Sequence, residues 1–204
     1  MLSAAERQAL LAHARSSVAA ALAGRTPPAP PAGGPAFAAP AAVFVTLHTT
    51  GGELRGCLGT FTARRPLPAA VAEYAVAAAT RDSRFPAVTA RELAELRLKV
   101  SVLSPLVPVR DPAEVEVGRH GIYILGRGRW EGYAGCYLPE VATEFGMGRE
   151  EFLTHCSARK AGLPPDAWKD PAQAEVRVFT TESFGEEPTA DEPAPDAAPG
   201  RSRP

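Results

Sequence analysis

Hydrophobic side chains recur along the chain at two spacings, and each spacing predicts a different kind of element. Residues 3–24 carry apolar side chains three or four positions apart, after a Ser-x-x-Glu sequence. This pattern predicts an amphipathic helix that begins with a capping box at Ser3 and ends at Gly24. An alanine-rich helix with proline in its first turn is predicted over 66–80. In residues 96–102 apolar and polar positions alternate, which is typical of a strand with one buried face.

Further elements are predicted around glycine-containing turns. The β-type runs 43–47 and 54–61 flank the sequence Thr-Thr-Gly-Gly, which predicts a hairpin because glycine accepts positive φ. The other predicted elements are a short helix over 89–93, strands over 114–117, 121–125, 129–136 and 176–179, and helices over 139–145 and 149–161. Because runs of strands are interrupted by unequal helices, the pattern predicts an α+β fold rather than a regular βαβ array.

Composition divides the chain into four stretches. Residues 1–25 are assigned to the N-terminal helix, and residues 26–41, rich in Pro, Ala and Gly, to an irregular connection. Residues 42–184 are the main α+β domain. Residues 185–204 contain no large apolar side chain, so we expect a disordered tail there.

Charge and cysteine content exclude several classes of protein. With 204 residues, 45% of them apolar, the chain has ample material for a core, whereas a net charge of −1 without a long basic run argues against nucleic-acid binding. No apolar run approaches the roughly 20 residues needed to span a bilayer, and no signal peptide is visible. Three cysteines form neither an even disulfide set nor a zinc-type spacing. We therefore expect a soluble cytoplasmic protein without a membrane segment or a metal site.

The strongest candidate for a functional site is the heptapeptide Leu-Arg-Gly-Cys-Leu-Gly-Thr at 54–60. In an extended strand, Arg55 and Cys57 share a face with about 7 Å between their Cβ atoms. A guanidinium at this distance favours a thiolate. Gly56 and Gly59 leave bare backbone where a ligand or another chain could approach. Cys57 is thus a candidate nucleophile or redox thiol with Arg55 as its cation, while a buried structural cysteine is an equally good interpretation.

Three other side chains could join this site. His48 lies on the neighbouring strand of the predicted hairpin and is the nearest candidate for a Cys/His pair, although an exposed strand-end residue is the favoured interpretation. Asp82 and Arg84 follow the alanine-rich helix, where they could bind a polar substrate or simply form a local salt bridge. No cofactor follows from these residues.

Five ordered blocks of this sequence resemble the AMMECR domain family. They are the hairpin 42–59 with Leu-Arg-Gly-Cys-Leu-Gly, Arg-Asp-Ser-Arg-Phe-Pro at 81–86, Val-Ser-Val-Leu-Ser-Pro at 100–105, Leu-Pro-Glu-Val-Ala at 138–142, and the stretch from Lys160 to Trp168. The resemblance covers about residues 3–184. It implies an α+β fold of two unequal sub-domains around a mainly antiparallel sheet flanked by helices.

The resemblance also implies a biological setting. Bacterial and archaeal members of the family often accompany a Memo-like protein and a radical-SAM protein, in what is called the AmmeMemoRadiSam system, and this chain resembles its component A. Memo-like and radical-SAM proteins are therefore the expected partners. Two functions stay open: a site for a small molecule or a partner's product around Cys57, or a non-catalytic adaptor that binds these partners. The sequence does not decide whether the protein is an enzyme.

Overall fold

The computed structural model describes residues 1–186, which fall into two compact units. Unit 1 contains residues 1–102 and 182–186, and unit 2 contains residues 103–181. The α+β class and the two unequal sub-domains are therefore confirmed, with the difference that unit 1 is discontinuous in sequence. Of the predicted tail, residues 187–204 lie outside the described residues, and Gly185 still belongs to a strand.

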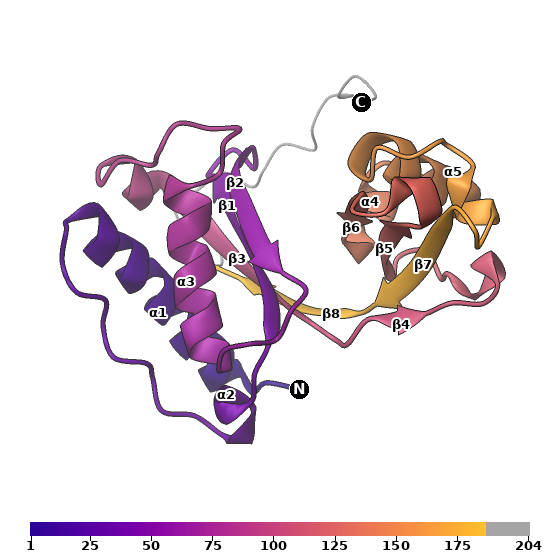
Figure 1. Ribbon diagram of the computed structural model, residues 1–204. Coiled ribbons are helices and arrows are strands. Elements are labelled where there is room, and N and C mark those ends of the chain that lie inside the picture. The colour runs from indigo at the N-terminus through magenta and orange to yellow at the C-terminus, as the bar shows by residue number, and fades with distance from the viewer. Residues whose placement is uncertain (187–204) are drawn as a thin grey trace. The chain divides into compact units, whose positions relative to one another are not determined.

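Unit 1 is a four-stranded sheet with helices on one face. Its strands are β1 (Ala42–Thr49), β2 (Leu54–Thr60), β3 (Leu96–Leu103) and β8 (Thr181–Gly185), in the spatial order β2-β1-β3-β8. Its helices are α1 (Ala4–Leu22), α2 (Pro35–Ala38), α3 (Leu67–Thr80) and the 3₁₀ helix η1 (Glu92–Glu95). Figure 1 shows α1 and α3 packed together against the sheet.

Local sequence explains the ends of α1. The Ser3 hydroxyl accepts the Glu6 N–H at 3.3 Å, and the Glu6 carboxylate accepts the Ser3 N–H at 2.8 Å. The predicted capping box is thus confirmed. Gly24 follows the helix with φ of +63°, a conformation in which glycine has no steric penalty.

The core of unit 1 lies between the helices and one face of the sheet. Val43, Val45 and Leu47 of β1 are fully buried there. Alternation places Phe44, Thr46 and His48 of β1, together with Cys57 of β2, on the opposite side of the sheet, which we call the cysteine face. The helices therefore cover one face only, and the candidate thiol lies on the other.

The predicted hairpin is confirmed and contains an irregularity. β1 and β2 pair antiparallel with Thr46 opposite Cys57, and the turn uses Gly52 at φ of +82°. The register shifts at Leu47 and His48, so that Arg55 has no residue opposite it. Such a bulge redirects the side chain of the extra residue and breaks simple alternation.

Unit 2 is a second antiparallel sheet with its own helices. Its strands are β4 (Val107–Pro108), β5 (Gly121–Gly126), β6 (Ala134–Tyr137) and β7 (Ala174–Phe179), in the order β4-β7-β5-β6. Its helices are η2 (Pro112–Glu114), η3 (Gly128–Trp130), α4 (Pro139–Glu144), α5 (Arg149–His155), the π-helical continuation η4 (Cys156–Lys160) and η5 (Ala167–Lys169). Residues such as Phe152, whose ring stacks on Tyr137 at 5.6 Å, form its separate core.

Two strand predictions in unit 2 were wrong. The strand predicted over 114–117 is not formed, because Asp111 caps η2 with its own capping box. The strand predicted over 129–136 is shortened to β6, since Gly128 at φ of +58° begins a 3₁₀ turn through Trp130. Within residues 1–186, no helix is both long enough and apolar enough to cross a membrane.

Candidate functional site

Cys57 lies at the middle of β2, one of the two edge strands of the unit 1 sheet. Its side chain is half-buried on the cysteine face. The Thr46 hydroxyl, on the neighbouring strand directly opposite, donates to the Cys57 Sγ at 3.3 Å. The hairpin register therefore places a hydroxyl beside the sulfur.

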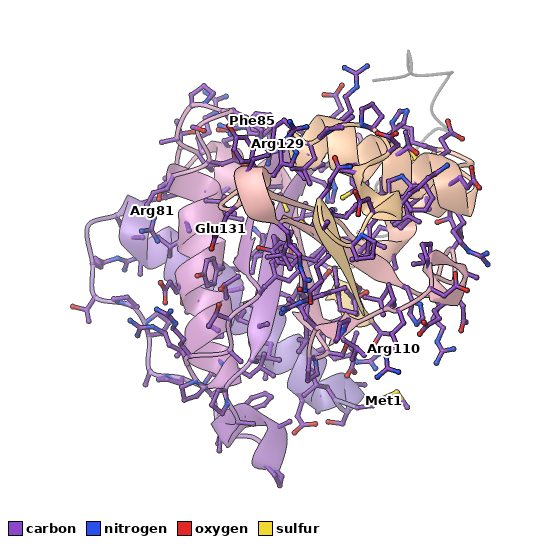
Figure 2. The ribbon with its side chains drawn as sticks, turned by 45° about the vertical axis from the view of Figure 1, so that its right-hand side comes forward. Met1, Arg81, Phe85, Arg110, Arg129 and Glu131 are labelled. Carbon is purple, nitrogen blue, oxygen red and sulfur yellow. The ribbon has the colours of Figure 1, made fainter. Side chains whose placement is uncertain are left out.

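The loop after α3 binds the backbone of Cys57 on its unpaired edge. The Cys57 N–H donates to Asp82 Oδ2 at 2.8 Å, and the Cys57 carbonyl accepts from Arg84 Nη2 at 3.3 Å. Because an edge strand has no neighbour to satisfy these groups, the two side chains take the place of a neighbouring strand at this residue. In Figure 2 the labels of Arg81 and Phe85 mark the beginning and end of the segment 81–85 that supplies them.

Asp82 is the most strongly held charged group of this cluster. It is only 6% exposed, and its carboxylate accepts the Arg84 N–H at 3.2 Å, the Nε at 2.9 Å and Nη2 at 2.6 Å. These hydrogen bonds from Arg84, with a smaller contribution from the Cys57 N–H, lower the pKa of Asp82 to about 2. Asp82 is therefore ionised at neutral pH and serves as an acceptor only.

Arg84 is electrostatically coupled to the thiol. Its pKa is raised chiefly by the hydrogen bonds to Asp82, and also by the charge interactions with Asp82 and Cys57. The predicted salt bridge between Asp82 and Arg84 is thus present, and the same pair reaches the cysteine. The geometry is therefore compatible with a local salt bridge and also with a site for a polar substrate.

Arg55 makes a different interaction from the predicted one. From the bulge, its Nε and Nη2 donate to the Glu92 carboxylate, the latter at 3.1 Å, and this contact lowers the pKa of Glu92. Its Nη1 is buried without a hydrogen-bond partner. The guanidinium groups of Arg55 and Arg84 both lie over the Phe85 ring, at 5.9 and 5.4 Å from its centroid. Arg55 therefore anchors β2 to η1, while Arg84 is the arginine that binds Cys57 directly.

The two glycines beside Cys57 are close-packed against the protein itself. A Cβ on Gly56 would lie 2.4 Å from the Ala78 carbonyl oxygen of α3, and a Cβ on Gly59 would lie 2.3 Å from the Phe44 ring. We expected this bare backbone to admit a ligand or another chain. In the structure, a helix and an aromatic ring occupy the two spaces.

His48 lines a hollow of about 320 Å³. The other lining residues come from β3 and from the end of β8 with the residue after it, and they are Arg97, Leu98, Lys99 and residues 183–186. A second hollow, of about 450 Å³, lies between β2 and α3. Cys57 lines neither of these two. His48 shares the cysteine face with Cys57 but belongs to a separate depression.

The other cysteines occupy unit 2. Cys156 is fully buried, and burial raises the pKa of its thiol well above the ordinary value. Cys136 is half-buried on β6 opposite Tyr123. None of the three cysteines forms a disulfide, and within residues 1–186 no group of three His, Cys, Asp or Glu side chains is arranged to hold a metal ion.

Sequence reasoning missed three members of the cluster. Thr46 could have been found from the hairpin register, which places it opposite Cys57. Glu92 and Phe85 lie far from the heptapeptide in sequence, and no local pattern signals their contact with Arg55. They are brought to β2 only by the path of the chain after α3.

Comparison with known proteins identifies the family. The AMMECR1 family model matches residues 11–184. The chain belongs to the AMMECR1 family. A protein from Thermococcus gammatolerans is 44% identical over 154 residues, which cover 71% of this chain and 72% of that protein. One from Methanosarcina mazei is 38% identical over 196 residues, covering 91% and 94% of the two chains.

The AMMECR1 fold is also found among solved structures. The crystal structure of an uncharacterized protein, PH0010 from Pyrococcus horikoshii, matches this chain with a TM-score of 0.79 at 36% identity, covering 87% of this chain and 90% of that one. The family match spans the whole Cys57 cluster, from Thr46 to Glu92. The predicted family and fold are thus confirmed, while the partners and the reaction stay predictions.

Proposed function

We propose that this AMMECR1 protein acts as component A of an AmmeMemoRadiSam-type system in the cytoplasm, and that Cys57 is the centre of its working site. The proposal rests on two hydrogen bonds to the Cys57 backbone, one from its N–H to Asp82 and one from Arg84 to its carbonyl. These two bonds place a buried carboxylate and a half-exposed guanidinium on the peptide groups of the candidate thiol residue. Membership of the family supports the setting.

In this proposal each residue has a distinct part. The Cys57 thiol contacts the bound small molecule or the product of a partner, because it is half-buried rather than sealed. Arg84 supplies a positive charge that favours the thiolate, and Thr46 donates a hydrogen bond to the sulfur. Asp82 and Arg55 are positioning residues, since Asp82 holds Cys57 and Arg84 while Arg55 ties β2 to Glu92.

Alkylation of the thiol tests the proposed role. We expect iodoacetamide to modify Cys57 near neutral pH faster than it modifies a model thiol such as glutathione, and faster than it modifies Cys136. Replacing Arg84 by Gln should slow the reaction of Cys57, because the neighbouring positive charge is lost, while leaving that of Cys136 unchanged. A Cys57 that reacts no faster than glutathione in the folded protein would contradict a reactive centre.

A second function, a non-catalytic adaptor, is favoured by a specific observation. The spaces beside Gly56 and Gly59 are filled by α3 and Phe44, so the surroundings of Cys57 offer a surface more than a hollow. In this version the loop 81–86 and β2 form a docking surface for a Memo-like or radical-SAM protein. Binding of a purified partner that survives Cys57→Ala but is lost in folded Arg84→Ala would support the adaptor. Loss of binding with Cys57→Ala alone would favour the thiol site.

A further inference from the structure

The hollow of about 450 Å³ in unit 1 lies away from Cys57, between the end of β2 and the first turns of α3. Its lining residues are Ala41, Thr60, Thr62, Arg64, Arg65, Ala70, Glu73 and Tyr74. Ligand sites of small molecules have volumes in this range, and the lining here is unusual in combining two guanidinium groups with three hydroxyls. None of these groups has a part in the Cys57 cluster.

The charges of this hollow do not cancel. Its one carboxylate, Glu73, already pairs with Arg65 at 2.8 Å. Arg64 is exposed and forms no ion pair or hydrogen bond with the described part of the chain. The lining therefore carries a net positive charge from Arg64, beside a second guanidinium that Glu73 orients.

The backbone that carries the two arginines is held in place on both sides. The Ala41 N–H donates to the Arg65 carbonyl at 3.0 Å, and the Leu67 N–H donates to the Ala39 carbonyl at 3.1 Å. At the other end, the Thr62 N–H donates to the Thr60 hydroxyl at 3.0 Å. Because these bonds order the loop in advance, a ligand would bind without first having to fold it.

We propose that this hollow binds the phosphate group of a small phosphorylated molecule. A guanidinium fork matches phosphate oxygens with paired N–H donors, and the hydroxyls of Thr62 and Tyr74 are additional donors at the same wall. Arg64 is the principal phosphate ligand. Tyr74 also presents an aromatic ring that could contact the part of the ligand beyond its phosphate group. This inference goes beyond the proposed function, because it requires neither Cys57 nor a protein partner.

Titration of the full chain with inorganic phosphate tests the proposal. With ionic strength held constant by chloride, we expect saturable shifts of the amide resonances of residues 60–65 and 70–74, with a dissociation constant on the order of 1 mM. Replacing Arg64 by Gln should weaken phosphate binding at least tenfold. Arg81→Gln is the matched control, because Arg81 is an exposed arginine at the opposite end of α3 and its loss changes the net charge equally. It should leave binding unchanged.

Three outcomes would overturn the proposal. They are the absence of a saturable shift, shifts that lie elsewhere in the chain, and an equal loss of binding in the two arginine variants, which would indicate a general charge effect. Acetate tests whether the hollow binds a carboxylate instead of a phosphate. If acetate bound as tightly as inorganic phosphate, the proposed ligand class would be wrong. The variant Cys57→Ser should bind phosphate like the wild type, so this site and the proposed thiol site can fail independently.

Discussion

The Cys57 N–H donates to the Asp82 carboxylate at 2.8 Å across 25 positions of sequence. This contact joins the edge of the sheet to the loop after α3, and the same carboxylate holds Arg84. A buried acceptor that serves a backbone N–H and a guanidinium together stabilises the fold and sets the position of the thiol.

Replacing Asp82 by Asn should lower the free energy of unfolding by about 2 kcal/mol, because the change removes the charge from hydrogen bonds that an ionised acceptor strengthens and leaves Arg84 without its counterion. Urea denaturation measures the difference. The control is Glu116→Gln, which breaks an exposed ion pair with Arg119 and should leave the free energy of unfolding nearly unchanged. Equal effects of the two substitutions would show that the Asp82 contacts add nothing to stability.

The stability contributed by Asp82 should depend on pH in a defined window. Its pKa is about 2 in the folded protein, below the ordinary value of 3.8, so the ionised form stabilises the native state. This contribution, about 2 kcal/mol, is complete above about pH 4 and is lost as the pH falls through 2. Urea denaturation of the wild type and of Asp82→Asn across this range should therefore show a difference that shrinks on acidification. A difference that stays constant from pH 4 to pH 2 would mean that another property of the variant is responsible.

Replacing Gly56 by Ala should destabilise unit 1 by about 1–3 kcal/mol, because the added methyl group would lie 2.4 Å from the Ala78 carbonyl oxygen and force α3 away from β2. Thermal or urea unfolding measures the loss. Gly51→Ala, in the hairpin turn, is the matched substitution, since its methyl group would have only an ordinary contact at 3.7 Å with Thr49. If Gly56→Ala were as stable as Gly51→Ala, the close packing of helix and strand would not limit stability.

Cys156 should be protected from alkylation until the protein unfolds. It is fully buried, and burial raises the pKa of its thiol, so both access and thiolate content are low. Mass spectrometry after iodoacetamide treatment in native buffer should find Cys57 modified and Cys156 intact. In concentrated guanidinium chloride all three cysteines should react at similar rates. Modification of Cys156 at the rate of Cys57 in native buffer would argue against this packing of unit 2.

Local patterns predicted most of the elements, but they missed the local turns at η2 and η3 and the last strand, whose place depends on longer-range contacts. The capping box of α1 and the turn of the hairpin need only neighbouring residues, and both are as predicted. The strand β8 was missed because residues 181–185 lack a clear apolar alternation. Its place beside β3 is fixed by contacts such as those of Glu186 with Leu98. The Glu186 N–H donates to the Leu98 carbonyl at 3.0 Å, and the Leu98 N–H donates to the Glu186 carboxylate at 2.9 Å.

The candidate site shows the same division. Its centre, Cys57, and the pair Asp82 and Arg84 were all named from the sequence, and the structure brings these three together. The assignment of Arg55 as the cation for the thiol assumed regular alternation, which the bulge in β2 interrupts. Glu92 then takes this guanidinium, which a strand pattern cannot show.

By itself the sequence determined the family, the α+β class, the two ends of α1 and the hairpin that carries Cys57, because these depend on motifs and on residues a few positions apart. Only the tertiary structure decided which arginine reaches the cysteine, what fills the space beside each glycine, and that the last strand returns to the first unit. The physical reason is that hydrogen bonds and packing between distant segments depend on where the whole backbone places them, and not on the spacing of residues along it.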